Sequence, residues 1–175
     1  MKRTASSADG RTLRDVILGG QDGLVNVLGI VLGVATAEAV TRTVLIAGLA
    51  ATVAESLSMG AVAYTSGKAA RDFYRSHRVR ADGSSVFEHP LRSGVVVGLA
   101  SVIGSLIPLV PFFFIAPGPA RWVSAGVCTA VLFVVGCVKG RITRVTHWKS
   151  GAELAIIGML SALAGYVVGL ALSAI

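Results

Sequence analysis

Apolar residues recur along this chain in long blocks that are separated by short polar segments. A helix needs roughly 20 apolar residues, at about 1.5 Å each, to cross a hydrocarbon core of ~30 Å. Five blocks meet this length, and the predicted helices cover about 14–37, 43–65, 91–115, 121–140 and 151–174. The pattern therefore predicts an all-α integral membrane protein with five transmembrane helices. They fill a single transmembrane domain, 14–175, after a polar lead, 1–13.

The polar segments add detail to this plan. The longest, 68–90, is basic, and the helical composition of its first half is expected to extend the second helix beyond the membrane. Pro90 suits the first turn of the third helix, where proline is tolerated. Pro108 and Pro111 lie near the far end of that helix and are predicted to kink or end it.

The distribution of charge fixes a predicted orientation. The chain is 54% hydrophobic and 14% charged, yet its net charge is +7. Fourteen of the 16 Lys and Arg residues precede the first helix or lie in the second and fourth connections, and the other side holds only Arg42 and Arg121. Positive residues favour the cytoplasmic side. We therefore expect a multi-pass protein of a bacterial or archaeal cytoplasmic membrane, with its N-terminus cytoplasmic and its C-terminus outside. The basic excess is interpreted as topology and contact with anionic membrane lipid, and nucleic acid is not an expected partner.

Glycine is frequent within the predicted helices, often at a spacing of four. Such small residues let helix backbones approach closely in lipid. The pairs are Gly19/Gly23, Gly29/Gly33 and Gly165/Gly169. Two of the three pairs fall in the first helix, which is therefore predicted to be surrounded by protein.

Three carboxylates stand out because ionisable groups inside a membrane are costly, by about 2.5–3.5 kcal/mol on insertion scales. Asp22 lies deep in the first predicted helix, Glu55 lies within the second, and Asp15 stands near the start of the first. Asp15 and Asp22 are two turns apart, so they share a helix face about 10 Å apart along the axis.

Two further side chains fall in register with these acids. Asn26 follows Asp22 by four residues, and Met59 follows Glu55 by four, so each pair shares a helix face. If the two faces meet, they form a column of oxygen ligands with one thioether sulfur. Sulfur biases such a site toward softer first-row metals such as Fe²⁺ or Mn²⁺ over Mg²⁺ or Ca²⁺.

Structural alternatives remain open for several of these residues. Asp15 could be a helix cap favoured by the helix dipole. Glu55 could be neutral and hydrogen-bonded across a helix pair, and Met59 could be core filler. Asp22 lies too deep for capping. No nucleophile–base pair, phosphate-binding glycine loop or metal-ligand histidine spacing occurs, so the sequence does not predict an enzyme.

Two segments of the chain resemble the vacuolar iron transporter family. They are RDVILGGQDGLVNVLGIVLGVA (14–35) and VLIAGLAATVAESLSMGAVAY (44–64). Weaker similarity to the family continues through HPLRSGVVVGLASVIGSLIPLVPFF and WKSGAELAIIGMLSALAGYVVG. The resemblance covers most of residues 14–172, and its specific part is the first two helices.

The resemblance implies a five-helix homodimer that exports Fe²⁺, and often Mn²⁺, from the cytosol in exchange for protons. It implies an ion path along the dimer interface, lined mainly by the first helix with contributions from the second. Asp15, Asp22 and Met59 match family positions implicated in that path, and Glu55 matches a position that is acidic in many bacterial-type relatives.

The chain departs from the family pattern in two respects. Ala51 stands at a position of the second helix that is polar or acidic in other members. Many members also carry a glutamate-rich cytoplasmic metal-binding domain between the second and third helices. Only the short basic loop 68–90 stands here, with Asp72, Asp82 and Glu88 as its acids. In this respect the chain is similar to nodulin-like members that lack that domain.

The resulting hypothesis is a proton-coupled antiporter for divalent transition metal. Its metal residues are Asp22, Glu55, Met59, Asp15 and Asn26. Its partners are a second copy of the chain, membrane lipid, protons, and Fe²⁺ or Mn²⁺ as cargo, with no permanently bound cofactor. A non-transporting scaffold or subunit of a larger complex, and a passive cation channel, remain the alternatives.

Overall fold

The computed structural model describes residues 7–77 and 89–174, and this part of the chain is helical throughout apart from short connections. Five helical spans are long and apolar enough to cross a membrane. Their helices are α1 (Ser7–Ala37), α2 (Thr41–Ser76), α3 (Pro90–Leu106), α5 (Pro117–Ile142) and α6 (His147–Ser173). The prediction of an all-α membrane protein with five spanning helices is confirmed.

The span that begins with α3 is interrupted near its end, as its prolines predict. A 3₁₀ turn, η2 (Ile107–Leu109), follows α3, and a short helix, α4 (Val110–Phe114), completes the span. Proline cannot donate a backbone hydrogen bond, so regular α-helix gives way to the 3₁₀ turn that contains Pro108, and Pro111 lies in the first turn of α4. The Ser124 hydroxyl donates to the Pro108 carbonyl at 2.8 Å, which ties α5 to this break.

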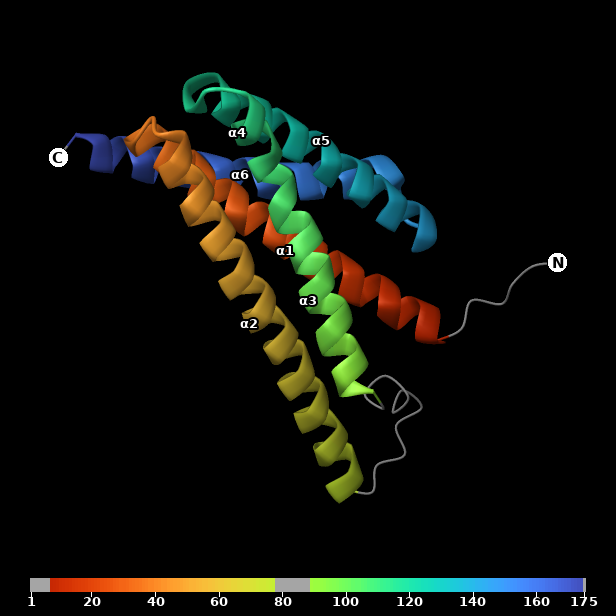
Figure 1. Cartoon of the computed structure of the whole chain (residues 1–175). Helices are drawn as coiled ribbons and strands as arrows, with labels where there is room; N and C mark the ends of the chain where they lie inside the picture. Colours follow the sequence, from red (N-terminus) through yellow and green to blue (C-terminus); the bar gives the residue numbers. More distant parts are fainter. Residues whose placement is uncertain (1–6, 78–88, 175) are drawn as a thin grey trace.

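Helix α1 lies at the centre of the bundle (Figure 1), with α2 and α3 on one side and α5 and α6 on the other. Its glycines explain the close packing. A Cβ atom on Gly19 would collide with the backbone carbonyl of Val97 in α3. A Cβ atom on Gly33 would lie 3.0 Å from the carbonyl oxygen of Gly165 in α6. Helix α1 contacts α2, α3, α5 and α6, in line with the predicted close packing, but Val16, Leu18 and Ile30 leave one part of its surface exposed.

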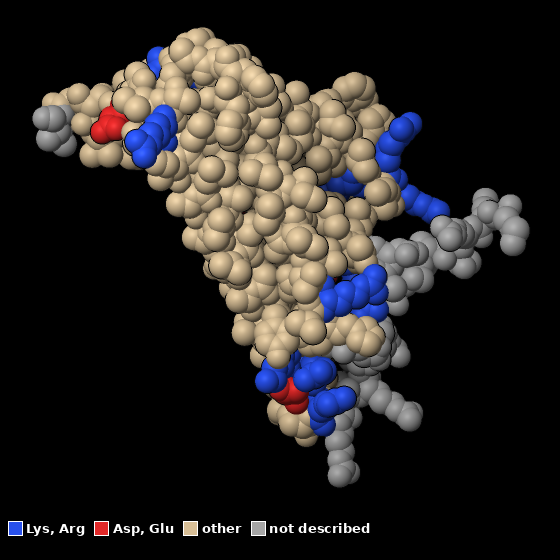
Figure 2. All heavy atoms as spheres, viewed as in Figure 1, with Lys and Arg blue, Asp and Glu red and all other residues tan. Residues whose placement is uncertain are grey.

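Basic side chains gather at one end of the bundle, where α1, α3 and α6 begin and α2 and α5 end. Figure 2 shows blue atoms at this end and a broad band of uncharged residues beyond it. We call it the basic end. Its described basic residues are Arg11, Arg14, Lys68, Arg71, Arg75, Arg92, Lys139, Arg141, Arg144 and Lys149. By the positive-inside rule this end is expected to face the cytoplasm.

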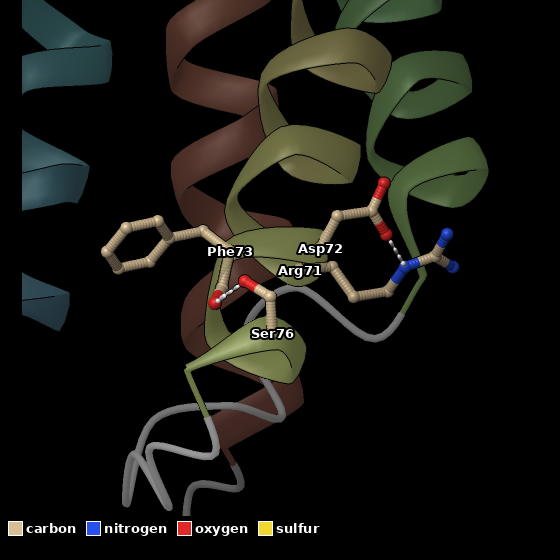
Figure 3. A network of polar contacts seen from close by, with 4 residues as sticks. All are labelled: Arg71, Asp72, Phe73 and Ser76. Carbon is tan, nitrogen blue, oxygen red and sulfur yellow. Dashed lines mark hydrogen bonds and ion pairs between the residues drawn. The ribbon is translucent and has the colours of Figure 1, made fainter.

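Helix α2 continues past its predicted end at residue 65 and closes at Ser76. Residues 68–76 are therefore helical, as the composition of the first half of the segment 68–90 predicted. Figure 3 shows the end of α2, where the Ser76 hydroxyl donates a hydrogen bond to the Phe73 carbonyl at 2.9 Å. One turn earlier, Nε of Arg71 lies 3.5 Å from Oδ1 of Asp72. Asp82 and Glu88 lie outside the described residues.

Candidate metal-binding site

A polar contact joins α1 and α2 within the spanning region. The Nδ2 group of Asn26 donates a hydrogen bond to Oε1 of Glu55 at 2.7 Å. The two residues are 29 positions apart in sequence, so the contact arises only from the packing of the two helices. The side chain of Asn26 is exposed on the surface of the bundle, and Glu55 is half-buried beside it.

Asp22 belongs to the same group. It precedes Asn26 by one helical turn, is half-buried, and lies close enough to Glu55 for a side-chain hydrogen bond and direct charge interaction. We call Asp22, Asn26 and Glu55 the mid-span site. It offers two carboxylates and an amide whose oxygen is not used in the contact with Glu55. Hard oxygen donors of this kind bind divalent cations.

Asp15 and Met59 lie elsewhere, around a cavity of about 430 Å³ at the basic end between α1, α2 and α3. Asp15 is buried, with 6% of its surface exposed, and accepts a hydrogen bond from the Ser93 hydroxyl of α3 at 2.7 Å. Met59 is half-buried and lines the same cavity. One turn of α2 separates Met59 from Glu55, so α2 connects the cavity to the mid-span site.

The position of Asp15 corrects one interpretation of the sequence. Helix α1 begins at Ser7, not near residue 14, so Asp15 stands two turns inside the helix. A carboxylate at that depth cannot cap the free amides of the first turn. Its partner is Ser93 on a neighbouring helix, so Asp15 contributes to the packing of α1 against α3.

The five predicted residues therefore lie in two groups along α1 and α2: Asp15 and Met59 line the cavity, and Asp22, Asn26 and Glu55 form the mid-span site. Within residues 7–77 and 89–174, no three His, Cys, Asp or Glu side chains lie together as a metal-binding group. A first-row divalent ion usually takes four to six ligands. The mid-span site of a single chain supplies only part of such a set.

The sequence reasoning missed a set of hydroxyl groups on α3. Ser101 and Ser105 are fully buried, and Ser56 of α2 donates to Ser101 at 3.3 Å. Both α3 hydroxyls face Gly23, the residue after Asp22. The sequence does contain a signal for these hydroxyl groups, because Ser93, Ser101 and Ser105 recur at multiples of four along a largely apolar span.

Comparison with known proteins gives a consistent result. The model of the VIT family matches residues 13–83 and 76–170, which together cover most of the chain. The chain belongs to the VIT family. The two matched segments meet in the polar connection between α2 and α3.

Named relatives within the VIT family are similar over nearly the whole chain. Vacuolar iron transporter 1 of Oryza sativa subsp. japonica is 28% identical over 211 residues, which cover 90% of this chain and 84% of the relative. Vacuolar iron transporter homolog 2 of the same plant is 30% identical over 166 residues, covering 89% and 88%. An uncharacterized protein of the archaeon Methanocaldococcus jannaschii is 29% identical over 153 residues, covering 81% and 80%.

Proposed function

We propose that this protein transports divalent transition-metal ions, Fe²⁺ or Mn²⁺, out of the cytosol in exchange for protons. Its relatives in the VIT family are named iron transporters, and metal-ion transport is the activity that their names support. The observation that carries the proposal is the mid-span site, where an exposed amide is bonded to a carboxylate inside a spanning region.

The exposure of Asn26 and the half-burial of its carboxylate partner support a homodimer. Polar groups that face hydrocarbon are costly, and intramembrane carboxylates almost always face protein or a water-filled path. A second copy packed against this surface of α1 and α2 would remove the mid-span site from lipid. By symmetry it would add a second Asp22, Asn26 and Glu55 and complete a ligand set that one chain lacks. The ion path would then run along the subunit interface.

The chemistry of exchange follows from the two carboxylates. A metal ion that binds Asp22 and Glu55 needs both groups deprotonated, so its arrival releases any proton they hold. When the ion leaves on the outer side, the carboxylates again bind protons from that side. One cycle then moves a metal ion outward and protons inward, and the proton gradient drives the export. Met59 and Asp15 line the cavity through which the ion would approach from the basic end.

The test is flux through purified protein in liposomes with an imposed proton gradient. The wild type should accumulate Fe²⁺ or Mn²⁺ and move protons in the opposite direction. Asp22→Asn and Glu55→Gln should each abolish both movements. Glu153→Gln provides a matched control, because Glu153 is an exposed acid on the first turns of α6 and lies outside the site.

The outcomes separate the alternatives. Wild-type activity in Asp22→Asn would refute the assignment of the site. Metal flux without proton movement would identify a passive channel instead. A wild type that moves no metal from a panel of Fe²⁺, Mn²⁺, Co²⁺, Ni²⁺ and Zn²⁺ would favour the scaffold.

A further inference from the structure

The cavity at the basic end is lined by positively charged residues, which a path for cations does not explain. Its lining residues include Arg11, Arg14 and Arg92, together with His89. Among the described residues of this lining, Asp15 is the only acidic side chain, and it is already bonded to Ser93. The described lining of this cavity of about 430 Å³ thus carries three arginines and one aspartate.

The three arginines have no acidic partner in the described parts of the chain. There, Arg71 and Asp72 form the single ion pair, and it lies outside the cavity lining. Arginine presents a planar fork of donors that matches the oxygens of phosphate, often through two parallel hydrogen bonds. Three such groups around one cavity form a polyvalent anion site.

The start of α3 also favours an anion in this cavity. Pro90, Arg92 and Ser93 from its first turn line the cavity. Among the described residues, no side chain caps this helix and its first turn has no acid. Free amide groups and the positive end of the helix dipole favour an anion at such a position.

The rest of the cavity is apolar. Leu18, Val62, Ala63 and Val96 line it alongside the arginines. A cavity with cationic and apolar walls, located at the basic end of the apolar spans, matches the headgroup and upper chain of an anionic phospholipid. A free phosphate would use only the cationic walls.

We propose that this cavity binds a phosphate group through Arg11, Arg14 and Arg92, and that an anionic phospholipid of the adjacent leaflet supplies it. The binding does not depend on the transport activity proposed above. It has one consequence for that activity: a bound phosphate would neutralise the guanidinium groups that otherwise repel a divalent cation near Asp15 and Met59.

The experiment is native mass spectrometry of the purified protein in detergent, with phosphatidylglycerol or phosphatidylcholine added at equal concentration. The cavity variant combines Arg11→Gln, Arg14→Gln and Arg92→Gln. The matched variant combines Lys139→Gln, Arg141→Gln and Lys149→Gln, which remove the same charge from the same end but do not line the cavity.

The wild type and the matched variant should bind phosphatidylglycerol in preference to phosphatidylcholine. Each cavity arginine should contribute about fivefold to that affinity, so the cavity variant should lose roughly a hundredfold. Equal phosphatidylglycerol binding by the cavity variant and the wild type would overturn the proposal. So would equal binding of the two lipids by the wild type.

Competition with inorganic phosphate and glycerol phosphate distinguishes the two sources of phosphate. Failure of both to displace phosphatidylglycerol at millimolar concentration supports the lipid. Displacement by either, together with its arginine-dependent binding in calorimetry, overturns the lipid assignment and supports a soluble phosphate in the same site. Arg14 and Arg92 are exposed, so Arg14→Gln and Arg92→Gln singly should leave the fold intact and still lower the affinity.

Discussion

The Nδ2 group of Asn26 on α1 donates a 2.7 Å hydrogen bond to Oε1 of Glu55 on α2. This contact holds one carboxylate oxygen of Glu55 in place, and Asp22 lies within interaction range of the same carboxylate. An amide in this position orients the carboxylate without carrying charge itself.

Asn26→Ala should therefore weaken transport more than it weakens the fold. Hydrogen bonds between transmembrane helices contribute about 0.6–1.7 kcal/mol, so the melting temperature in detergent should fall only slightly. Loss of a group that orients a metal ligand typically lowers affinity or activity about 10–100-fold. Metal uptake into liposomes measures the effect. Uptake unchanged from wild type would show that Asn26 does not orient Glu55 for binding.

The hydrogen bond between Ser93 and Asp15 predicts a specific loss of stability. Ser93→Ala would leave a buried carboxylate without this donor, at a cost of about 1–3 kcal/mol in the free energy of unfolding. Ser66→Ala is the matched control, because Ser66 lines the same cavity but is exposed and bonds only to its own helix. Denaturant titration in mixed micelles should show destabilisation for Ser93→Ala alone. Equal stability of the two variants would mean that Asp15 has another compensating partner.

The packing of α1 against α3 predicts opposite results for two glycine substitutions. Gly19→Ala would drive a Cβ atom into the backbone carbonyl of Val97, which cannot move aside without displacing α3. Overpacking of this kind costs about 1–3 kcal/mol. Gly126→Ala on the exposed surface of α5 meets nothing within 4 Å and should be neutral or slightly stabilising. Thermal unfolding followed by size-exclusion chromatography compares them, and equal melting temperatures would contradict the close approach.

The proposed homodimer predicts which helix surface cross-links. Ile30 follows Asn26 by one turn of α1 and is 40% exposed. In a background of Cys128→Ala and Cys137→Ala, Ile30→Cys should form a covalent dimer with a short bifunctional thiol reagent in membranes. Val134→Cys is the control, since Val134 is exposed on α5 and lines an apolar groove of about 750 Å³ against α6. Cross-linking through Val134→Cys alone would place the subunit contact on α5 and α6 instead.

Much of the architecture follows from the sequence alone. The length of the apolar blocks determines five spans, because hydrocarbon thickness sets a minimum helix length. Pro108 and Pro111 determine the break after α3, since the missing amide is a local property of proline. The glycines of α1 predicted its close packing against α3 and α6 for a similar local reason: a missing side chain permits close approach.

Only the tertiary structure shows which of the candidate residues lie together. Helical spacing placed Asp15 with Asp22, and Glu55 with Met59, but spacing says nothing about the rotation and tilt of one helix against another. Packing brings Asn26 to Glu55 and turns Asp15 toward Ser93 on α3. The structure also shows that α1 begins at Ser7, which rules out Asp15 as a cap. The cavity lined by three arginines likewise comes from segments far apart in sequence, because α1, α2 and α3 meet only after they pack.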